Sequence, residues 1–382
     1  MKKLIAIAAS AVLAMGAFAF TACSPATPED PTGAIPPAGF DNYEEVDVSS
    51  EEKKQEFVEE LSTRINPELL FGDMTKSDWS FGLAEDAAVK AEVSIDMDEL
   101  KISGNVELKE ALKAKLSVPA SETEESFIPF GIKMSAEIGA NGNVNLPELI
   151  YSQMGEQGPL VKSLLTNFDY SAKAYLDNEY VYASLSSSIL SKLPEEAGLP
   201  ESGKFKAPLS LIMGGGDYNE PDYDNDPGIT YALTNEVTPD DETAAMIEQV
   251  ITILKQYSVS VAVSTDAGYS VKLTAGTDTV LAILGDVADE EVVTTLKQVV
   301  TFKTCALTAY LAVDENGVFQ QVSLGLNIDL SVKASAGTLG NGSPNIEGSA
   351  KLEASLNITK FDGEIKFPTD IDSYVDLFAE EE

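Results

Sequence analysis

The stretch Thr301–Val332 constrains the fold of this chain most strongly, because apolar and polar side chains alternate along its second half. One parity carries Val318, Val322, Leu324, Leu326, Ile328, Leu330 and Val332, with Gln320 as the only break. Alternation with a period of two is typical of a half-buried antiparallel strand. We predict a hairpin with strands at 301–313 and 318–332. The turn would be Asp314-Glu315-Asn316-Gly317, because Asn and Gly tolerate positive φ.

Each arm of this hairpin is longer than a common strand. At about 3.3 Å per residue an arm reaches ~40 Å, whereas most strands have ~5–6 residues. The same alternation recurs over residues 88–118 and 350–358. Long strands with one apolar side suit a large curved sheet. We therefore predict an α+β, mainly β fold, in which a large curved antiparallel sheet (a half-barrel) carries a few amphipathic helices on its concave face.

Several segments have the spacing of amphipathic helices, among them residues 50–66, residues 147–167 and a segment that starts at Thr238-Pro239-Asp240-Asp241. Residues 50–66 place Phe57, Val58, Leu61 and Ile65 on one side and follow Ser49, which together with Glu52 matches a capping box. Residues 147–167 also have a helical pattern, broken near 155–159. Trp79, the only tryptophan, is expected in the core rather than on a ligand platform.

Composition limits the chemistry that this chain can perform. It has 63 acidic and 25 basic residues, so its formal net charge is −38, and it has no histidine. Such a charge repels nucleic acid and anionic lipid headgroups. Without histidine, Ser-His-Asp and Cys-His catalysis and His-ligated metal sites are excluded. We find no catalytic motif and predict that the protein is not an enzyme.

The N-terminus has the features of an export signal. Lys2 and Lys3 precede an apolar run, and Phe20-Thr21-Ala22-Cys23 follows. Residues 1–22 resemble a bacterial lipoprotein signal peptide with Cys23 as the lipidated residue, although the commoner motif has Leu and then Ala or Ser in place of Phe20 and Thr21. The resemblance implies a location in the cell envelope, anchored to a bacterial membrane and exposed outside the cytoplasm. The alternatives are an ordinary secretory peptide cleaved near Ala22 and a transmembrane anchor.

Composition also divides the rest of the chain. Residues 23–48 are rich in proline, and we predict a disordered tether. Residues 49–376 form the predicted β-rich domain. Its two halves, 49–213 and 229–376, have a loosely similar order of helix and strands, separated by an acidic loop at 214–228. Residues 377–382 are an acidic tail. Cys305 alternates in register with apolar neighbours, which predicts a buried structural thiol.

The acidic loop contains one candidate metal site. Asp222, Asp224 and Asp226 resemble the opening of an EF-hand-type calcium loop, because a hard cation prefers several oxygen ligands on one short turn. The pattern departs from that loop at Pro227, where the sixth position requires Gly, and at Leu233, where the twelfth requires Glu. The alternative is a solvated acidic loop without Ca²⁺.

The overall pattern resembles the LolA/LolB and LppX/LprG carrier lipoproteins over about residues 49–375. It rests on the lipobox, the tether, the long one-sided strands and the amphipathic helices. The resemblance implies an apolar cavity between a curved sheet and its helices that takes up acyl chains, carried by a lipid or a lipidated protein. The competing interpretation is that the apolar face is a filled core. The sequence identifies no ligand-binding residues.

The sequence is also compatible with two other functions. The chain could be a surface or scaffold lipoprotein that contacts another envelope protein, or an envelope hydrolase. A carrier predicts an apolar cavity of several hundred Å³. A scaffold predicts an exposed contact patch, and an enzyme predicts a cleft with carboxylates of perturbed pKa.

Overall fold

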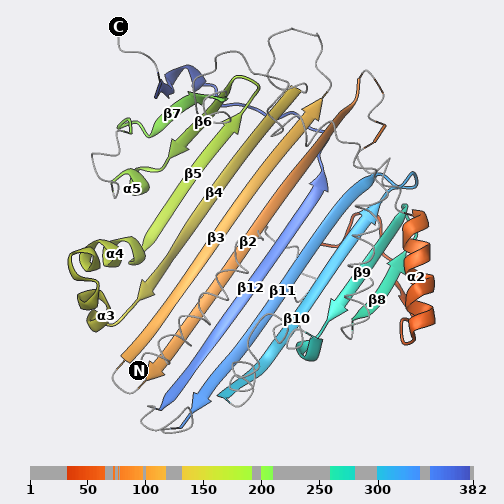
Figure 1. Cartoon of the computed structure of the whole chain (residues 1–382), viewed down its shortest axis with the longest axis horizontal. Coiled ribbons are helices and arrows are strands. Elements are labelled where there is room, and N and C mark those ends of the chain that lie inside the picture. Colours follow the sequence, from red (N-terminus) through yellow and green to blue (C-terminus); the bar gives the residue numbers. More distant parts are fainter. Residues whose placement is uncertain are drawn as a thin grey trace, which may run out of the picture.

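The chain folds into one open, curved sheet of 13 strands (Figure 1). The computed structural model describes residues 32–64, 72–73, 76, 78–97, 100–117, 131–191, 199–209, 259–279, 299–335 and 345–378. The strand order is β1-β8-β9-β10-β11-β12-β2-β3-β4-β5-β6-β7-β13, and neighbours are antiparallel except β7 and β13. The predicted mainly β fold with a large curved sheet is therefore confirmed.

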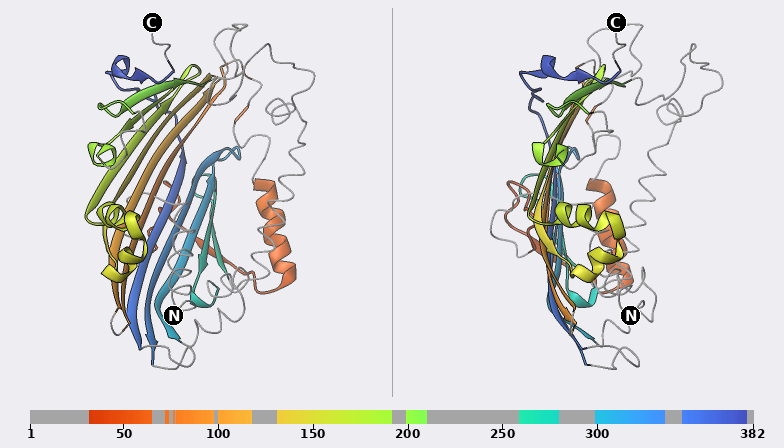
Figure 2. Two further views of the ribbon diagram at one scale, coloured as in Figure 1. Left: turned by 60° about the vertical axis from the view of Figure 1, so that its left-hand side comes forward. Right: turned by 90° about the vertical axis from the view of Figure 1, so that its left-hand side faces the viewer.

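The strands are β1 (Glu44–Val46), β2 (Ser80–Met97), β3 (Leu100–Ser117), β4 (Gly131–Asn145), β5 (Phe168–Leu176), β6 (Tyr180–Leu185), β7 (Lys204–Pro208), β8 (Ser260–Ser264), β9 (Tyr269–Ala275), β10 (Val300–Val313), β11 (Phe319–Ala334), β12 (Ile346–Lys360) and β13 (Val375–Asp376). The helices are α2 (Glu51–Arg64), α3 (Glu148–Gln153), α4 (Gly158–Leu165) and α5 (Ser187–Leu190), with short 3-10 turns η2 (Gly155–Gln157) and η4 (Ile371–Ser373). Helices α2, α3 and α4 lie on the concave side of the sheet (Figure 2).

The predicted long hairpin is present as β10 and β11. Its turn is closed by the Asp314 carboxylate, which accepts hydrogen bonds from the backbone N–H groups of Asn316 (2.8 Å) and Val318 (3.0 Å). Gly317 adopts the positive φ (80°) that such a turn requires. A bulge explains the break in alternation, because the register passes from Ala312 opposite Gln321 to Val313 opposite Phe319 and skips Gln320.

The register divides the sheet into two faces, because residues directly opposite each other in antiparallel strands point to the same side. On one side lie the odd-numbered residues of β2, β6, β7, β8 and β9, and those of β10 from Cys305 onward. The same side carries the even-numbered residues of β3, β4, β5 and β12, and those of β11 from Val322 onward. These residues are mostly Ala, Val, Leu and Ile, and we call this side the apolar face. The opposite side carries mostly Lys, Glu, Asp, Asn and Ser, and we call it the polar face.

Both predicted halves contribute to this single sheet. Strands β2–β7 of the first half follow one another outward from the centre, and β12 of the second half pairs with β2. Both halves cross the sheet in the same direction, from β8 to β12 and then from β2 to β7, so the second half lies beside the start of the first half. That the two halves arose by duplication stays a prediction. The acidic loop at 214–228 lies outside the described residues.

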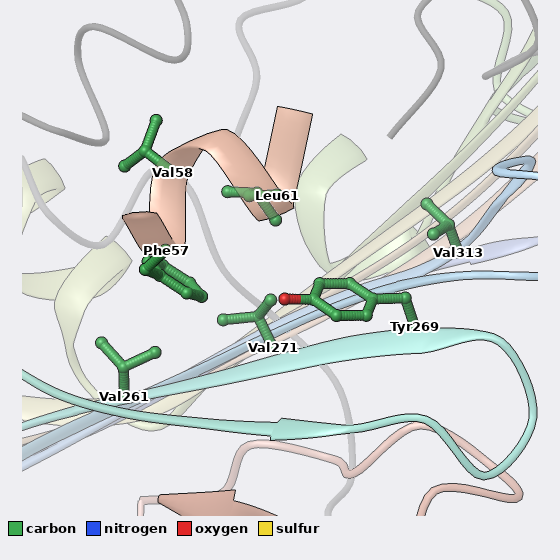
Figure 3. Packing of buried hydrophobic residues seen from close by; sticks show 7 residues of the cluster. All are labelled: Phe57, Val58, Leu61, Val261, Tyr269, Val271 and Val313. Carbon is green, nitrogen blue, oxygen red and sulfur yellow. The ribbon is translucent and has the colours of Figure 1, made fainter. Parts of the chain in front are cut away.

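Helix α2 anchors the end of the apolar face near β8 and β9. Its buried Phe57, Val58 and Leu61 pack against Val261, Tyr269, Val271 and Val313 (Figure 3). The N-cap of α2 lies one residue after the predicted position. The Ser50 side chain, not that of Ser49, accepts the backbone N–H of Lys53 (3.3 Å), so Ser50 is the N-cap. Trp79 is buried with Phe81 and Phe319, as expected of a core residue.

Part of the predicted tether is folded. Within residues 23–48, the segment 32–48 runs over the polar face and includes β1, which pairs with β8. The Ile35 backbone donates to the Ser323 hydroxyl (2.8 Å), and its carbonyl accepts from the Gln321 side chain (2.8 Å). Proline-rich composition predicted a disordered chain, but these contacts with one face of the sheet hold the segment. We call residues 32–48 the strap. Residues 23–31 lie outside the described residues.

Cys305 is buried on the apolar face, as predicted, and burial raises the pKa of its thiol to about 11. At pH 8 only about one thiol in a thousand would be ionised, and the thiolate is the reactive form. We expect Cys305 in a protein of residues 24–382, which lacks Cys23, to resist a maleimide reagent at pH 8 and to react fully after unfolding. Equal labelling rates before and after unfolding would contradict this placement.

Candidate functional site

The apolar face is the strongest candidate for a binding surface. It runs across the sheet from Val261 on β8 to Phe205 on β7. Large aliphatic side chains on it remain exposed: Ile138 on β4 is 51% exposed, and Leu116 on β3 and Leu324 on β11 are each 38% exposed. Single exposed apolar residues are common on proteins, but large ones that share one sheet face are typical of a contact surface.

Short helices border this face on the side opposite α2. The α3–η2–α4 segment follows β4, and the Tyr170 hydroxyl on the apolar face donates to the Leu164 carbonyl of α4 (3.0 Å). The predicted break in the 147–167 helix is confirmed at Gly155–Gln157. Three large apolar side chains of this segment are also exposed, namely Leu149, Met154 and Leu160. The helices thus add apolar surface next to the strands.

Two carboxylates interrupt the apolar face in β2 and β3. Glu85 lies opposite Leu112 and Glu110 lies opposite Ala87, so the two acids are diagonal neighbours. Such neighbours are typically about 7–8 Å apart. Desolvation, and secondarily the charge of Glu110, raises the pKa of Glu85. Two carboxyl groups on an otherwise apolar face make this part of it unfavourable for an anionic headgroup.

The raised pKa of Glu85 makes the stability of the fold depend on pH. The Glu85 carboxyl group holds its proton more tightly in the folded protein than in the unfolded chain. Its contribution to the free energy of unfolding therefore decreases as the pH rises from about 4 through the pKa that the group has in the folded state. We expect Glu85→Gln to raise the denaturation midpoint at pH 7 and to leave it unchanged near pH 3.5. Glu92→Gln, on the polar face of the same strand, is the control. Parallel pH profiles for wild type and Glu85→Gln would contradict this assignment.

Hollows lined by described residues lie elsewhere. One of about 670 Å³ is lined by Ser94, Asp96, Lys101, Asn345, Glu347, Gly348 and Ser349, and a neighbouring one of about 460 Å³ shares Ser94 and Ser349. Both open mainly on the polar face. A third, of about 240 Å³, lies between the end of β3–β4 and the segment around Ile365. These three hollows are not the apolar cavity between sheet and helices that a carrier predicts. The candidate site is the apolar face itself, on which Val89 and Leu352 are buried whereas Ile138, Leu116 and Leu324 are exposed.

The predicted site residues are not placed by the structure. Cys23 and the candidate calcium ligands Asp222, Asp224 and Asp226 lie outside the described residues. Within the described part of the chain, no group of three or more His, Cys, Asp or Glu residues could hold a metal ion.

No helix among the described residues is both long enough and apolar enough to cross a membrane.

Sequence reasoning found the alternating residues of 88–118 and 350–358, which lie in β2, β3 and β12, but it did not single out those of β4. Ile138 belongs to β4, which runs without interruption from Gly131 to Asn145. In the sequence, Glu85 and Glu110 can be recognised only as polar residues at positions where the alternation predicts apolar ones. The signal was present in the parity of each strand, but pairing the two acids requires the register between β2 and β3.

Comparison with known proteins gives no family. No family model matches the chain, and no curated protein matches it. Among solved structures, it is similar to one described as the crystal structure of the P. putida toluene transporter TodX, with 7% identity over 78% of this chain and 93% of that chain. The TM-score is 0.10, so this likeness carries no argument about fold or function.

Proposed function

We propose that this protein is an exported lipoprotein, anchored to a membrane through Cys23, that binds acyl chains on its apolar face without catalysis. The acyl chains would belong to a lipid or a lipidated protein. The features of residues 1–23 support the anchor, since apolar residues followed by Cys23 fit a lipoprotein signal. Acyl chains on Cys23 would contribute about 0.8 kcal/mol per buried CH₂, so several chains hold a protein on a bilayer.

The observation that carries the binding proposal is the exposure of Ile138, Leu116 and Leu324 on the apolar face, which only Glu85 and Glu110 interrupt in β2 and β3. Burying apolar surface is worth roughly 25 cal/mol per Å², so a flexible alkyl chain laid over these side chains gains affinity without specific polar contacts. The neighbouring α3–η2–α4 segment also exposes large apolar side chains. An extended acyl chain matches a long, concave and apolar surface.

One observation favours a second candidate, a scaffold that contacts another envelope protein. The C-terminal edge of the sheet exposes Val375 of β13 and also Leu377 and Phe378. An exposed edge strand can pair with another chain. This patch is small and lies at the edge of the sheet, whereas the apolar face spans strands from both halves of the chain.

The test is mass spectrometry of an organic extract. Protein of residues 24–382, which lacks Cys23, is exposed to membrane lipids, purified again and extracted. We expect a lipid in a stoichiometric amount, and its mass identifies the ligand class. A clean extract, repeated with lipids from the native membrane, would exclude the lipid-binding function and favour the scaffold. A lipidated peptide offered in place of lipids separates the two sources of acyl chains.

A further inference from the structure

The strap lies on the face of the sheet opposite the helices (Figure 2). Ile35 is hydrogen-bonded to Ser323 and Gln321, and the Tyr43 hydroxyl hydrogen-bonds that of Ser270 (2.8 Å). Ser323, Gln321 and Ser270 all belong to the polar face. The chain therefore enters the folded domain on the polar face.

The entry point is fixed near the middle of β11. A Cβ added at Gly325 would lie 2.3 Å from the Ala34 nitrogen and 2.6 Å from the Thr32 carbonyl oxygen, so the strap backbone sits directly on this glycine. Thr32 and Ala34 are themselves buried. Strand β11 is separated from the β1 edge by four strand spacings, which is about 19 Å. Thr32 therefore lies over the polar face, far from the β1 edge of the sheet.

The length of chain before Thr32 limits how the domain can face a membrane. Eight residues separate Cys23 from Thr32, so the nine Cα–Cα steps between them span at most about 30 Å. To bring the apolar face to the bilayer, this chain would first cross the ~19 Å to the β1 edge. It would then have to pass α2, whose diameter with side chains is about 10–12 Å. That path would use the whole reach of the extended chain between Cys23 and Thr32. The polar face can approach the bilayer without this detour.

The polar face also has the charge balance that a bilayer surface tolerates. In β2–β5 its positions carry seven lysines and six acids, although the chain as a whole has a net charge of −38. The lysines are Lys90, Lys101, Lys109, Lys113, Lys115, Lys133 and Lys173, and the acids are Asp86, Glu92, Asp96, Glu107, Glu137 and Asp169. Several form exposed ion pairs, such as Lys101–Asp96 (2.7 Å) and Lys109–Glu107 (3.0 Å). Anionic headgroups would not repel this surface as they repel the acidic chain overall.

We propose that the anchored protein holds its polar face toward its own bilayer and turns its apolar face away from it. This orientation rests on the proposed anchor at Cys23. Its consequence is that acyl chains reach the binding face from the aqueous side and not from the membrane that carries the protein.

The test uses the full-length lipidated protein on vesicles of phosphatidylethanolamine and phosphatidylglycerol. A fluorophore is attached at Ser94→Cys on the polar face or at Ile138→Cys on the apolar face, and energy transfer to a headgroup-labelled lipid is measured. A sheet with its side chains is about 10 Å thick, so we expect transfer from position 94 to be roughly twofold higher. Insertion of about 20 Gly/Ser residues after Pro31 should remove the difference, because the longer linker allows either face to approach.

Flotation of the vesicles separates the failures. Protein that floats but shows equal or reversed transfer overturns the orientation and leaves the anchor standing. Protein that does not float overturns the anchor and the orientation together, and leaves acyl-chain binding by residues 24–382 to its own test.

Discussion

Replacing Ile138 by Asp is expected to weaken binding of an acyl-chain probe by at least about tenfold. Ile138 is 51% exposed, so a ligand that covers it gains about half of the full-burial value, or about 0.8–1.5 kcal/mol, and 1.4 kcal/mol corresponds to a factor of ten in Kd. A carboxylate on the face adds a desolvation cost when the probe covers it. The measurement is a fluorescence titration of residues 24–382 with a probe that has a neutral headgroup, because Glu85 and Glu110 make part of the face unfavourable for an anionic one.

The matched control is Ser135→Asp, which adds the same charge to β4 on the polar face. It should leave the Kd unchanged. Because Ile138 lies directly opposite Glu110, Ile138→Asp also creates a like-charge pair. Leu324→Asp avoids this complication, since its cross-strand neighbours are Ala309 and Leu356. Wild-type affinity in both folded Asp variants would show that acyl chains bind elsewhere.

Replacing Phe57 by Ala is expected to cost about 3–5 kcal/mol of unfolding free energy, the usual range for a buried Phe. Phe57 is 3% exposed and packs, with Val58 and Leu61, onto β8 and β9 (Figure 3). Short helices are marginal without such packing. The measurement is the urea unfolding curve of residues 24–382, monitored by circular dichroism.

The control for this prediction is Glu56→Ala, because Glu56 is the exposed neighbour of Phe57 on α2. It should change the unfolding free energy by no more than about 0.5 kcal/mol, as surface substitutions usually do. If Phe57→Ala were as mild as Glu56→Ala, the packing of α2 on the sheet would not stabilise the fold.

The sequence predicted those parts of the fold in which a local pattern determines the structure. The β10–β11 hairpin was predictable because alternation and the chemistry of the turn at Gly317 agree. The break at Gln320 was visible, but its cause was not, because a bulge is defined by the partner strand. The exact cap of α2 was missed by one residue, since Ser49 and Ser50 are chemically equivalent N-caps.

The strap was missed for a different reason. Its composition is that of a linker, and the hydrogen bonds of Ile35 to Ser323 and Gln321 join residues more than 280 positions apart. The diagonal pair Glu85–Glu110 likewise depends on the register between two strands. The sequence therefore predicted which residues share a face within one strand, but not which residues of different strands form the candidate site.

The most direct test of acyl-chain binding on the apolar face is photo-crosslinking with residue-level mapping. Residues 24–382 are loaded with a neutral lipid that carries a photoreactive acyl chain, irradiated, digested and sequenced by mass spectrometry. Because adjacent residues of a strand point to opposite faces, we predict adducts at Ile138 and Leu324 and none at the adjacent Glu137 or Ser323. Adducts at both parities, or on the polar face alone, would contradict the account.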